Sequence, residues 1–177
     1  MDTTILLTNV RLSYPNVFKA KASADGKGEP KFSAAFILDK KKDAGQIEKV
    51  KTLIDAIIKE NKLKVDPDKR CLKDGSSKPD NYEDTVMFIN ASSTKRPQVV
   101  NRDRSPLTEE DNVIYGGCYV NAVLNLWAQD NQFGRRVNAS LEVVQFVKDG
   151  EPFGRKPVDV NSVLPDLSDT VSGDGLD

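Results

Sequence analysis

The sequence predicts a mainly β protein: an OB-fold-like Greek-key β-barrel with one amphipathic α-helix, followed by a disordered acidic C-terminal tail. Three observations predict this fold class. Six or seven segments have strand character, one segment has helical spacing, and the longest strand begins with the pair Gly116 and Gly117. A β-sandwich fits the same pattern of strands. We expect the domain to occupy residues 1–156 and the tail residues 157–177.

The N-terminal region predicts two strands separated by a mobile loop. Residues 3–12 are rich in β-branched and aliphatic side chains, and turn-forming residues 14–16 should end this strand. Residues 19–30 show no period and predict the loop. Residues 31–39 predict the second strand, with one face formed by Phe32, Ala34, Phe36 and Leu38.

Helical spacing occurs once, over residues 46–62, where apolar residues recur at intervals of three and four. Asp43 followed by Gln46 resembles a capping box at its start. The opposite face carries charges of both signs, which is typical of a solvated surface. We therefore expect the helix to cover a sheet face or a barrel end.

The middle of the chain predicts short strands between long loops. Residues 66–84 contain prolines and a glycine, which predict a loop with a short extended piece around residues 71–73. Residues 85–91 and 97–100 predict two further strands.

Residues 113–147 predict two long strands joined by a tight polar turn at residues 129–132. The paired glycines near the start predict a bulge, a sharp bend or the close approach of another backbone. Alternation assigns one face of the first strand to the core: Cys118, Val120, Ala122, Leu124 and Leu126. The other face carries Tyr119, Asn121, Val123, Asn125 and Trp127.

This second face, with the cations beyond the turn, is a candidate nucleic-acid surface. Aromatic faces beside guanidinium groups on a sheet can stack on unpaired bases while the cations contact phosphates. The alternative is that Tyr119 and Trp127 pack beneath a loop or helix, as strand aromatics often do. Hydroxyls and cations on the loop at residues 92–96 can also hold phosphates. The candidate residues are Tyr14, Lys31, Lys95, Arg96, Arg102, Tyr119, Trp127, Phe133, Arg135 and Arg136.

The net charge of −1 hides an uneven distribution. The chain after Lys156 has no Lys or Arg but five aspartates, which leaves 22 acidic and 26 basic residues before it, a net charge of about +4. Such a tail can be merely solubilising, or it can compete with nucleic acid for basic side chains and dock onto partner proteins. The candidate partner-binding residues are Asp166, Asp169, Asp174, Leu176 and Asp177.

Composition argues against a metal site, a cofactor, a membrane span and catalysis. Two cysteines and no histidine exclude the usual zinc sites, and no phosphate-loop motif is present. No apolar run approaches the roughly 18 residues of a membrane span, and no signal peptide is recognisable, so we expect a reducing cytoplasm. A metal-dependent nuclease would need converging carboxylates. The best cluster, Glu109 to Asp111, lies in an apparent loop, and Asp39 has no preceding acidic partner.

Five segments, in order, resemble a known family. They are RLSYPNVF (11–18), KFSAAFILDK (31–40), STKRP with VVNRDR (93–104), YGGCYVNA (115–122) and VQFVKDGEPFG (144–154). Together they are similar to the phage-encoded single-stranded DNA-binding proteins. The resemblance implies an OB-fold core, an acidic tail and sequence-independent coating of single-stranded DNA during phage DNA replication, recombination and repair in an infected bacterial host.

Two other functions fit the same residues. A recombination protein that anneals strands would use the same surface. A protein-interaction module acting through the tail would bind no DNA at all.

Overall fold

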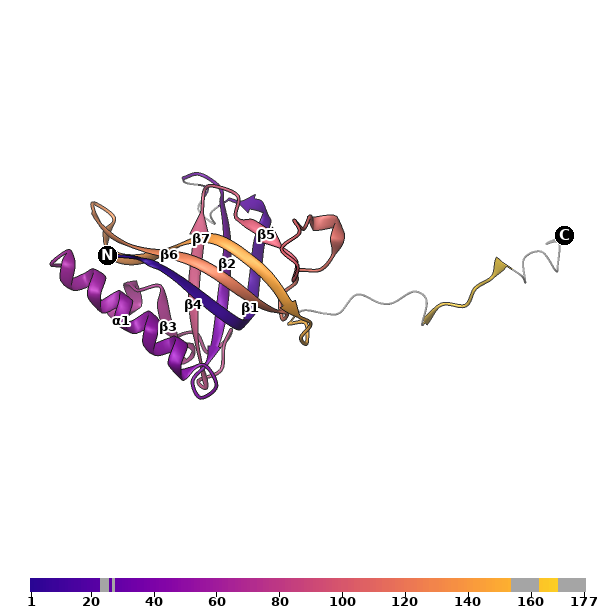
Figure 1. The fold of residues 1–177 in the computed structure, drawn as a ribbon, viewed down its shortest axis with the longest axis horizontal. Coiled ribbons are helices and arrows are strands. Elements are labelled where there is room, and N and C mark those ends of the chain that lie inside the picture. Colours follow the sequence, from indigo (N-terminus) through magenta and orange to yellow (C-terminus); the bar gives the residue numbers. More distant parts are fainter. Residues whose placement is uncertain (23–25, 27, 154–162, 169–177) are drawn as a thin grey trace.

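Five long strands form a closed barrel in the computed structural model, which describes residues 1–22, 26, 28–153 and 163–168 (Figure 1). They are β1 (Thr4–Lys21), β2 (Lys31–Asp39), β4 (Val86–Ser93), β6 (Tyr119–Asn131) and β7 (Gly134–Lys148). Their order around the barrel is β1-β2-β4-β7-β6, and β6 pairs with β1. All neighbours are antiparallel except β4 and β7. The predicted OB-like barrel is confirmed, and closure excludes the sandwich.

Shorter elements lie at the edges of the barrel. β3 (Leu72–Asp74) pairs with β4, and β5 (Gln98–Val100) pairs with β7. Single 3₁₀ turns occur at η1 (Pro67–Lys69), η2 (Gly75–Ser77) and η3 (Glu109–Asp111). The loop predicted over residues 66–84 therefore holds a short strand between two 3₁₀ turns, close to the predicted extended piece.

The barrel interior is filled by the side chains that alternation assigned to the core. All five predicted inward residues of the β6 region are buried, as are Ala34, Phe36 and Leu38 on β2. Because side chains alternate with period two, a slip by one residue would turn this set toward solvent. Burial of the aliphatic faces therefore fixes the register, and with it the side chains that point outward.

The long α-helix of the described residues, α1 (Ala44–Glu60), covers one end of the barrel (Figure 1). Its buried face, Ile47, Val50, Ile54 and Ile57, joins the main core, and the helix contacts β2, β6 and β7. The capping box predicted for Asp43 and Gln46 is wrong. The Asp43 carboxylate instead accepts from the Asp39 backbone N–H at 2.8 Å, while Gln46 bonds the Thr8 backbone. Among the described residues, no helix is long and apolar enough to span a membrane.

Two predicted turns lie elsewhere in the structure. β1 does not end at Tyr14: the chain passes through this residue with φ 48° and continues to Lys21 as a strand, with a shift in its register against β2. The hairpin turn is at residues 132 and 133 instead of 129–132, because Gln129 and Asp130 remain paired with Arg136 and Arg135. In both cases cross-strand pairing prevails over local turn preference.

The predicted tail lies mostly outside the described residues. Asp166 is exposed and accepts a hydrogen bond from the Ser168 backbone N–H at 2.9 Å. Its companions Asp169, Asp174, Leu176 and Asp177 are outside the described residues, as are the domain boundary at residue 156 and most of the segment predicted to be disordered.

Gly117 marks a close approach between two backbones, the third of the possibilities that the glycine pair predicted. It has φ +116°, and a Cβ at this position would lie 2.2 Å from the Glu151 carbonyl oxygen. A Cβ on Gly150 would in turn lie 2.1 Å from the Gly117 carbonyl oxygen. The start of β6 is thereby packed against the segment that follows β7.

Replacing Gly117 with alanine should destabilise the fold by about 1–3 kcal/mol, because the new Cβ meets a backbone carbonyl in a left-handed conformation. Urea denaturation measures this change. Gly116→Ala is the matched control: its Cβ would meet its nearest neighbour at 3.7 Å, so it should stay within about 0.5 kcal/mol of the parent. Equal stability of the two variants would contradict the close approach.

Candidate nucleic-acid interface

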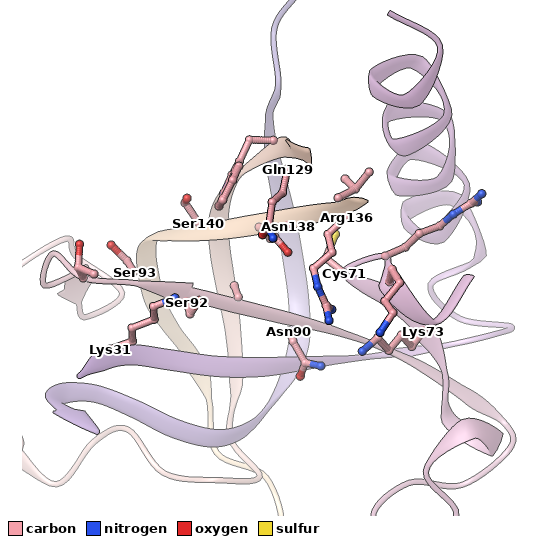
Figure 2. Close-up of a pocket in the computed structure, with 17 residues that line it drawn as sticks. Lys31, Cys71, Lys73, Asn90, Ser92, Ser93, Gln129, Arg136, Asn138 and Ser140 are labelled. Carbon is pink, nitrogen blue, oxygen red and sulfur yellow. The ribbon is translucent and has the colours of Figure 1, made fainter. Parts of the chain in front are cut away.

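A groove opens where β4 and β7 part. The two strands are in register at one position, Ser92 with Ser140. On the side of the residues that precede Ser92 and Ser140, the two strands separate. The segment that leads into β3 lies between them there, with Arg70 bridged to Val137 and β3 paired with β4. The resulting cavity has a volume of about 460 Å³ and is lined by residues of β2, β3, β4, β6 and β7 (Figure 2).

The lining is strongly cationic, and we call the cavity the basic groove. Its cations are Lys31, Lys69, Arg70, Lys73 and Arg136. Among the described residues that line it, none is acidic. A concave surface with cations of one sign and low-dielectric walls concentrates the field that attracts an anion.

The cations of the basic groove differ in how far they are already engaged. Arg70 donates to the Val65 carbonyl oxygen at 3.0 Å and lies 3.8 Å from Asp55. Lys31, Lys73 and Arg136 form no ion pair with any described residue. Figure 2 shows Arg136 and Lys73 extending into the same space.

Burial and like charge act on Lys73. Partial burial lowers the pKa of its ammonium group, and the neighbouring charges of Lys78 and Arg136 lower it further. An anion placed between Lys73 and Arg136 would relieve this repulsion, so the charges of the groove favour the binding of a phosphate.

Aromatic and amide side chains form one wall of the groove. Trp127 lies opposite Asn138 on the hairpin, and its side chain is 43% exposed. Asn138 Nδ2 donates to Gln129 Oε1 at 2.8 Å, Gln129 Nε2 donates to Asn131 Oδ1 at 3.2 Å, and the same oxygen accepts from the Phe133 N–H at 2.9 Å. We call this chain of hydrogen bonds the amide relay. It links the wall beside Trp127 to the hairpin tip, where Phe133 is 74% exposed.

The structure brings together three of the predicted residues, Lys31, Trp127 and Arg136, in the basic groove. Because Trp127 is exposed, it is not packed beneath a loop or helix, which was the alternative for this ring. Phe133 and Arg135 lie nearby at the hairpin tip, where Arg135 is 3.6 Å from Asp130.

Lys95 and Arg96 follow the groove residue Thr94 on the loop after β4. The backbone N–H of Lys95 bonds Ser93 Oγ, and Arg96 donates to the Phe18 carbonyl oxygen at 3.1 Å.

Other predicted residues lie apart from the groove. Tyr119 is on the same strand face as Trp127 but eight residues away, roughly 26 Å along the strand. Its ring is half-buried, with the ammonium groups of Lys42 and Lys148 at 5.2 and 4.9 Å from the ring centre. Arg102 donates to the Val147 carbonyl oxygen, near the end of β7. Tyr14 lies on β1.

Sequence reasoning missed Lys69, Arg70, Lys73 and Asn90, which also line the groove. The three cations within five residues of a predicted loop were a visible signal. Nothing in the sequence showed that this loop lies between two strands that come later in the chain.

The carboxylates weighed for a nuclease have structural roles. Asp39 accepts from the backbone N–H groups of Lys41 and Lys42, both at 2.8 Å, and these bonds lower its pKa. Asp111 caps η3 by accepting from the Thr108 N–H at 2.7 Å. Within the described part of the chain, no group of three potential metal-ligating side chains occurs.

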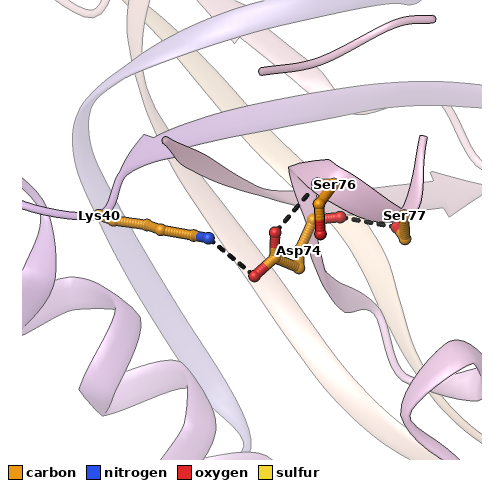
Figure 3. A network of polar contacts seen from close by, with 4 residues as sticks. All are labelled: Lys40, Asp74, Ser76 and Ser77. Atoms are coloured by element: carbon orange, nitrogen blue, oxygen red, sulfur yellow. Dashed lines mark hydrogen bonds and ion pairs between the residues drawn. The ribbon is translucent and has the colours of Figure 1, made fainter. Parts of the chain in front are cut away.

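A polar cluster holds β3, and hence Lys73, in place (Figure 3). Lys40 Nζ lies 2.8 Å from Asp74 Oδ2, while the other carboxylate oxygen accepts from the Ser76 N–H at 2.9 Å. Ser77 Oγ donates to the Asp74 carbonyl oxygen at 2.6 Å. The Lys40 contact and the hydrogen bonds from Ser76 lower the pKa of Asp74 to about 2.

A closed OB-type barrel with a cationic groove and an accessible tryptophan defines a class of proteins with a surface suited to single-stranded nucleic acid. Comparison with known proteins gives the family. The sequence pattern described as "Enterobacter phage Enc34, ssDNA-binding protein" matches residues 3–165. The chain therefore belongs to this family, and the resemblance seen in the sequence is confirmed.

Individual relatives agree with this membership. The single-stranded DNA-binding protein of bacteriophage Enc34, solved in complex with ssDNA, is 37% identical with a TM-score of 0.79, covering 86% of this chain and 90% of that one. Putative protein p50 of Acyrthosiphon pisum secondary endosymbiont phage 1 is 38% identical over 84% of this chain and 85% of its own length. The single-stranded DNA-binding protein gp2.5 of bacteriophage T7 is 13% identical with a TM-score of 0.58, covering 89% of this chain and 98% of that one, and it shares the fold.

Asp74→Asn should lower the free energy of unfolding by about 0.2–1 kcal/mol at neutral pH, the usual range for an exposed ion pair. Because the folded pKa lies below the ordinary value of 3.8, this contribution is complete above pH 3.8 and is lost as pH falls through about 2. Denaturation across this range, in a double-mutant cycle with Lys40→Met, measures it. A difference that persists below pH 2, or a coupling energy of zero, would contradict the assignment.

Proposed function

We propose that this protein binds single-stranded DNA, without sequence preference, in the basic groove. The observation that carries the proposal is a groove with five cations, no acidic residue among its described lining and the chain's single tryptophan on its wall. The Enc34 relative in complex with ssDNA supports the same ligand. Single-strand binders combine these materials, a positive groove for the backbone and aromatic rings for the bases.

In the proposed mechanism, Trp127 and Phe133 stack on bases while Lys31, Lys73 and Arg136 contact phosphates. Stacking contributes roughly 1–3 kcal/mol per base and tolerates any sequence, because every base has a π face. Phosphate contacts release condensed counterions, so affinity should fall with salt. Lys95 and Arg96 would extend the phosphate path beyond Thr94, and no catalytic step is required.

The biological role that we propose is the coating of exposed single strands during phage DNA replication, recombination and repair. The phage origin of the relatives supports this role. The acidic tail, with Asp166 at its described part, would modulate access to the groove and dock partner proteins through its carboxylates and Leu176.

Arg136→Ala should reduce the magnitude of the salt slope, the change in log affinity with log salt, by about 0.7, the value for one phosphate contact with a single strand. Titration with oligo-dT, followed by Trp127 emission at several salt concentrations, measures the slope. The neighbouring Arg135→Ala is the matched control: its guanidinium pairs with Asp130 outside the groove, and the slope should change less.

Two outcomes would count against the proposal in different ways. Unchanged emission together with no gel shift at low salt would contradict DNA binding. Equal slope changes for the two arginine variants would contradict the groove as the phosphate path.

Truncation after Lys156 should keep or increase the affinity for oligo-dT, because it removes five aspartates and leaves a domain of net charge about +4. The full chain titrated under the same low-salt conditions is the reference. A protein-interaction module would show no DNA affinity in either form, and a truncated form that loses affinity would contradict the competing role of the tail.

A further inference from the structure

A row of small polar side chains crosses all five barrel strands on the outer surface. Cross-strand pairing aligns Asn16 with Ser33, Ser33 with Ser92, Ser92 with Ser140, and Ser140 with Asn125. All five are half-buried and uncharged, and we call them the polar row. Its centre, Ser92 and Ser140, belongs to the lining of the basic groove.

Aromatic residues lie at both ends of the polar row and on the same side of it. Trp127 comes two residues after Asn125 on β6, and Tyr14 comes two residues before Asn16 on β1. Because β4 and β7 are parallel while the other neighbours are antiparallel, β1 and β6 run in opposite directions, and both positions fall on the side of the row that also carries Asn90. Four steps between strands separate the two rings, roughly 20 Å at about 4.8 Å per step.

The ring of Tyr14 is presented to solvent by a supporting cluster. It is 57% exposed and meets Tyr82 edge-on, with 6.5 Å between ring centroids and an interplanar angle of 86°. Tyr82 is stacked on the buried Phe88 at 4.4 Å, and Asn81 Nδ2 donates to the Tyr14 hydroxyl. The exposed ring is therefore held in one orientation by partners from a different segment.

The backbone of Tyr14 is strained, with φ 48°. A bulky side chain rarely occupies this left-handed region, where glycine or asparagine is accommodated more easily. Such strain persists where the surrounding structure enforces it, and it is concentrated at functional sites. Packing does not explain the tyrosine here, because more than half of its surface faces solvent.

We propose that Tyr14, supported by Tyr82, is a second base-stacking station for the same DNA strand that Trp127 holds, and that the strand crosses the barrel along the polar row. This inference rests on the proposed function and specifies the path of its ligand. Hydroxyl and amide side chains offer donors and acceptors to any base, so the path suits a binder without sequence preference. At about 3.4 Å per stacked base, the roughly 20 Å between stations corresponds to about six bases.

Tyr14→Asn tests the second station with two lengths of oligo-dT. An oligonucleotide of about twelve bases can reach both stations, whereas one of about four bases can reach only one. The variant should therefore bind the longer oligonucleotide about tenfold more weakly than the parent protein does. It should bind the shorter oligonucleotide, followed by Trp127 emission, as the parent protein does. Because asparagine tolerates the left-handed backbone, the Tm should stay the same or rise. Tyr14→Phe, which keeps the ring, should bind both strands nearly as the parent does.

Three other results would each contradict either the second station or the proposed function. Parent-like affinity of Tyr14→Asn for both lengths, with clear binding by the parent, would overturn the second station and leave the proposed function intact. A loss at both lengths with a lowered Tm would make Tyr14 a structural residue and also overturn the station. Absence of binding by the parent protein would overturn the proposed function itself.

Discussion

The surface proposed for DNA depends on how the barrel closes. β4 and β7 run parallel and meet in register at one position, so the closing contact cannot continue along the full length of both strands. The segment that leads into β3 occupies the gap between the two strands, with Arg70 bridged to Val137 on β7 and β3 paired with β4. Since side chains from several strands converge there without completing a sheet, a cavity remains between them. The groove is therefore a direct consequence of the way β4 and β7 close the barrel.

Charge and hydrogen bonding have different roles in this groove. The cations come from β2, β7 and the segment around β3, and no acidic side chain among the described lining neutralises them. The aromatic wall, by contrast, is organised by neutral amides that run from Asn138 to the hairpin tip. Gathering cations in one cavity costs stability to the folded protein: partial burial lowers the pKa of Lys73, and repulsion from Lys78 and Arg136 lowers it further. The Lys40–Asp74 ion pair stabilises the strand that carries this lysine.

Much of the fold followed from local patterns. Alternation along β6 identified the buried face correctly, and spacing over residues 46–62 identified the helix within two residues at each end. Local signals failed where a long-range partner competed with them. Tyr14 and the residues after it look like a turn, yet pairing with β2 keeps them in a strand. Gln46 bonds the Thr8 backbone and the Asp43 side chain, and it does not bond the Asp43 backbone N–H as a capping box requires. The groove was predicted only in part, because Lys73 becomes its neighbour through strand order and not through sequence spacing.

The amide relay holds the geometry of the hairpin tip by contacts that differ in kind from the electrostatic attraction of the groove. Its hydrogen bonds join neutral groups, so dissolved ions screen them far less than they screen the cations of the groove. Raising ionic strength would thus weaken the attraction that recruits an anion while leaving the tip and its ring in the same geometry. Salt would then set how often a strand is captured, and the preformed aromatic surface would set how each captured strand is held.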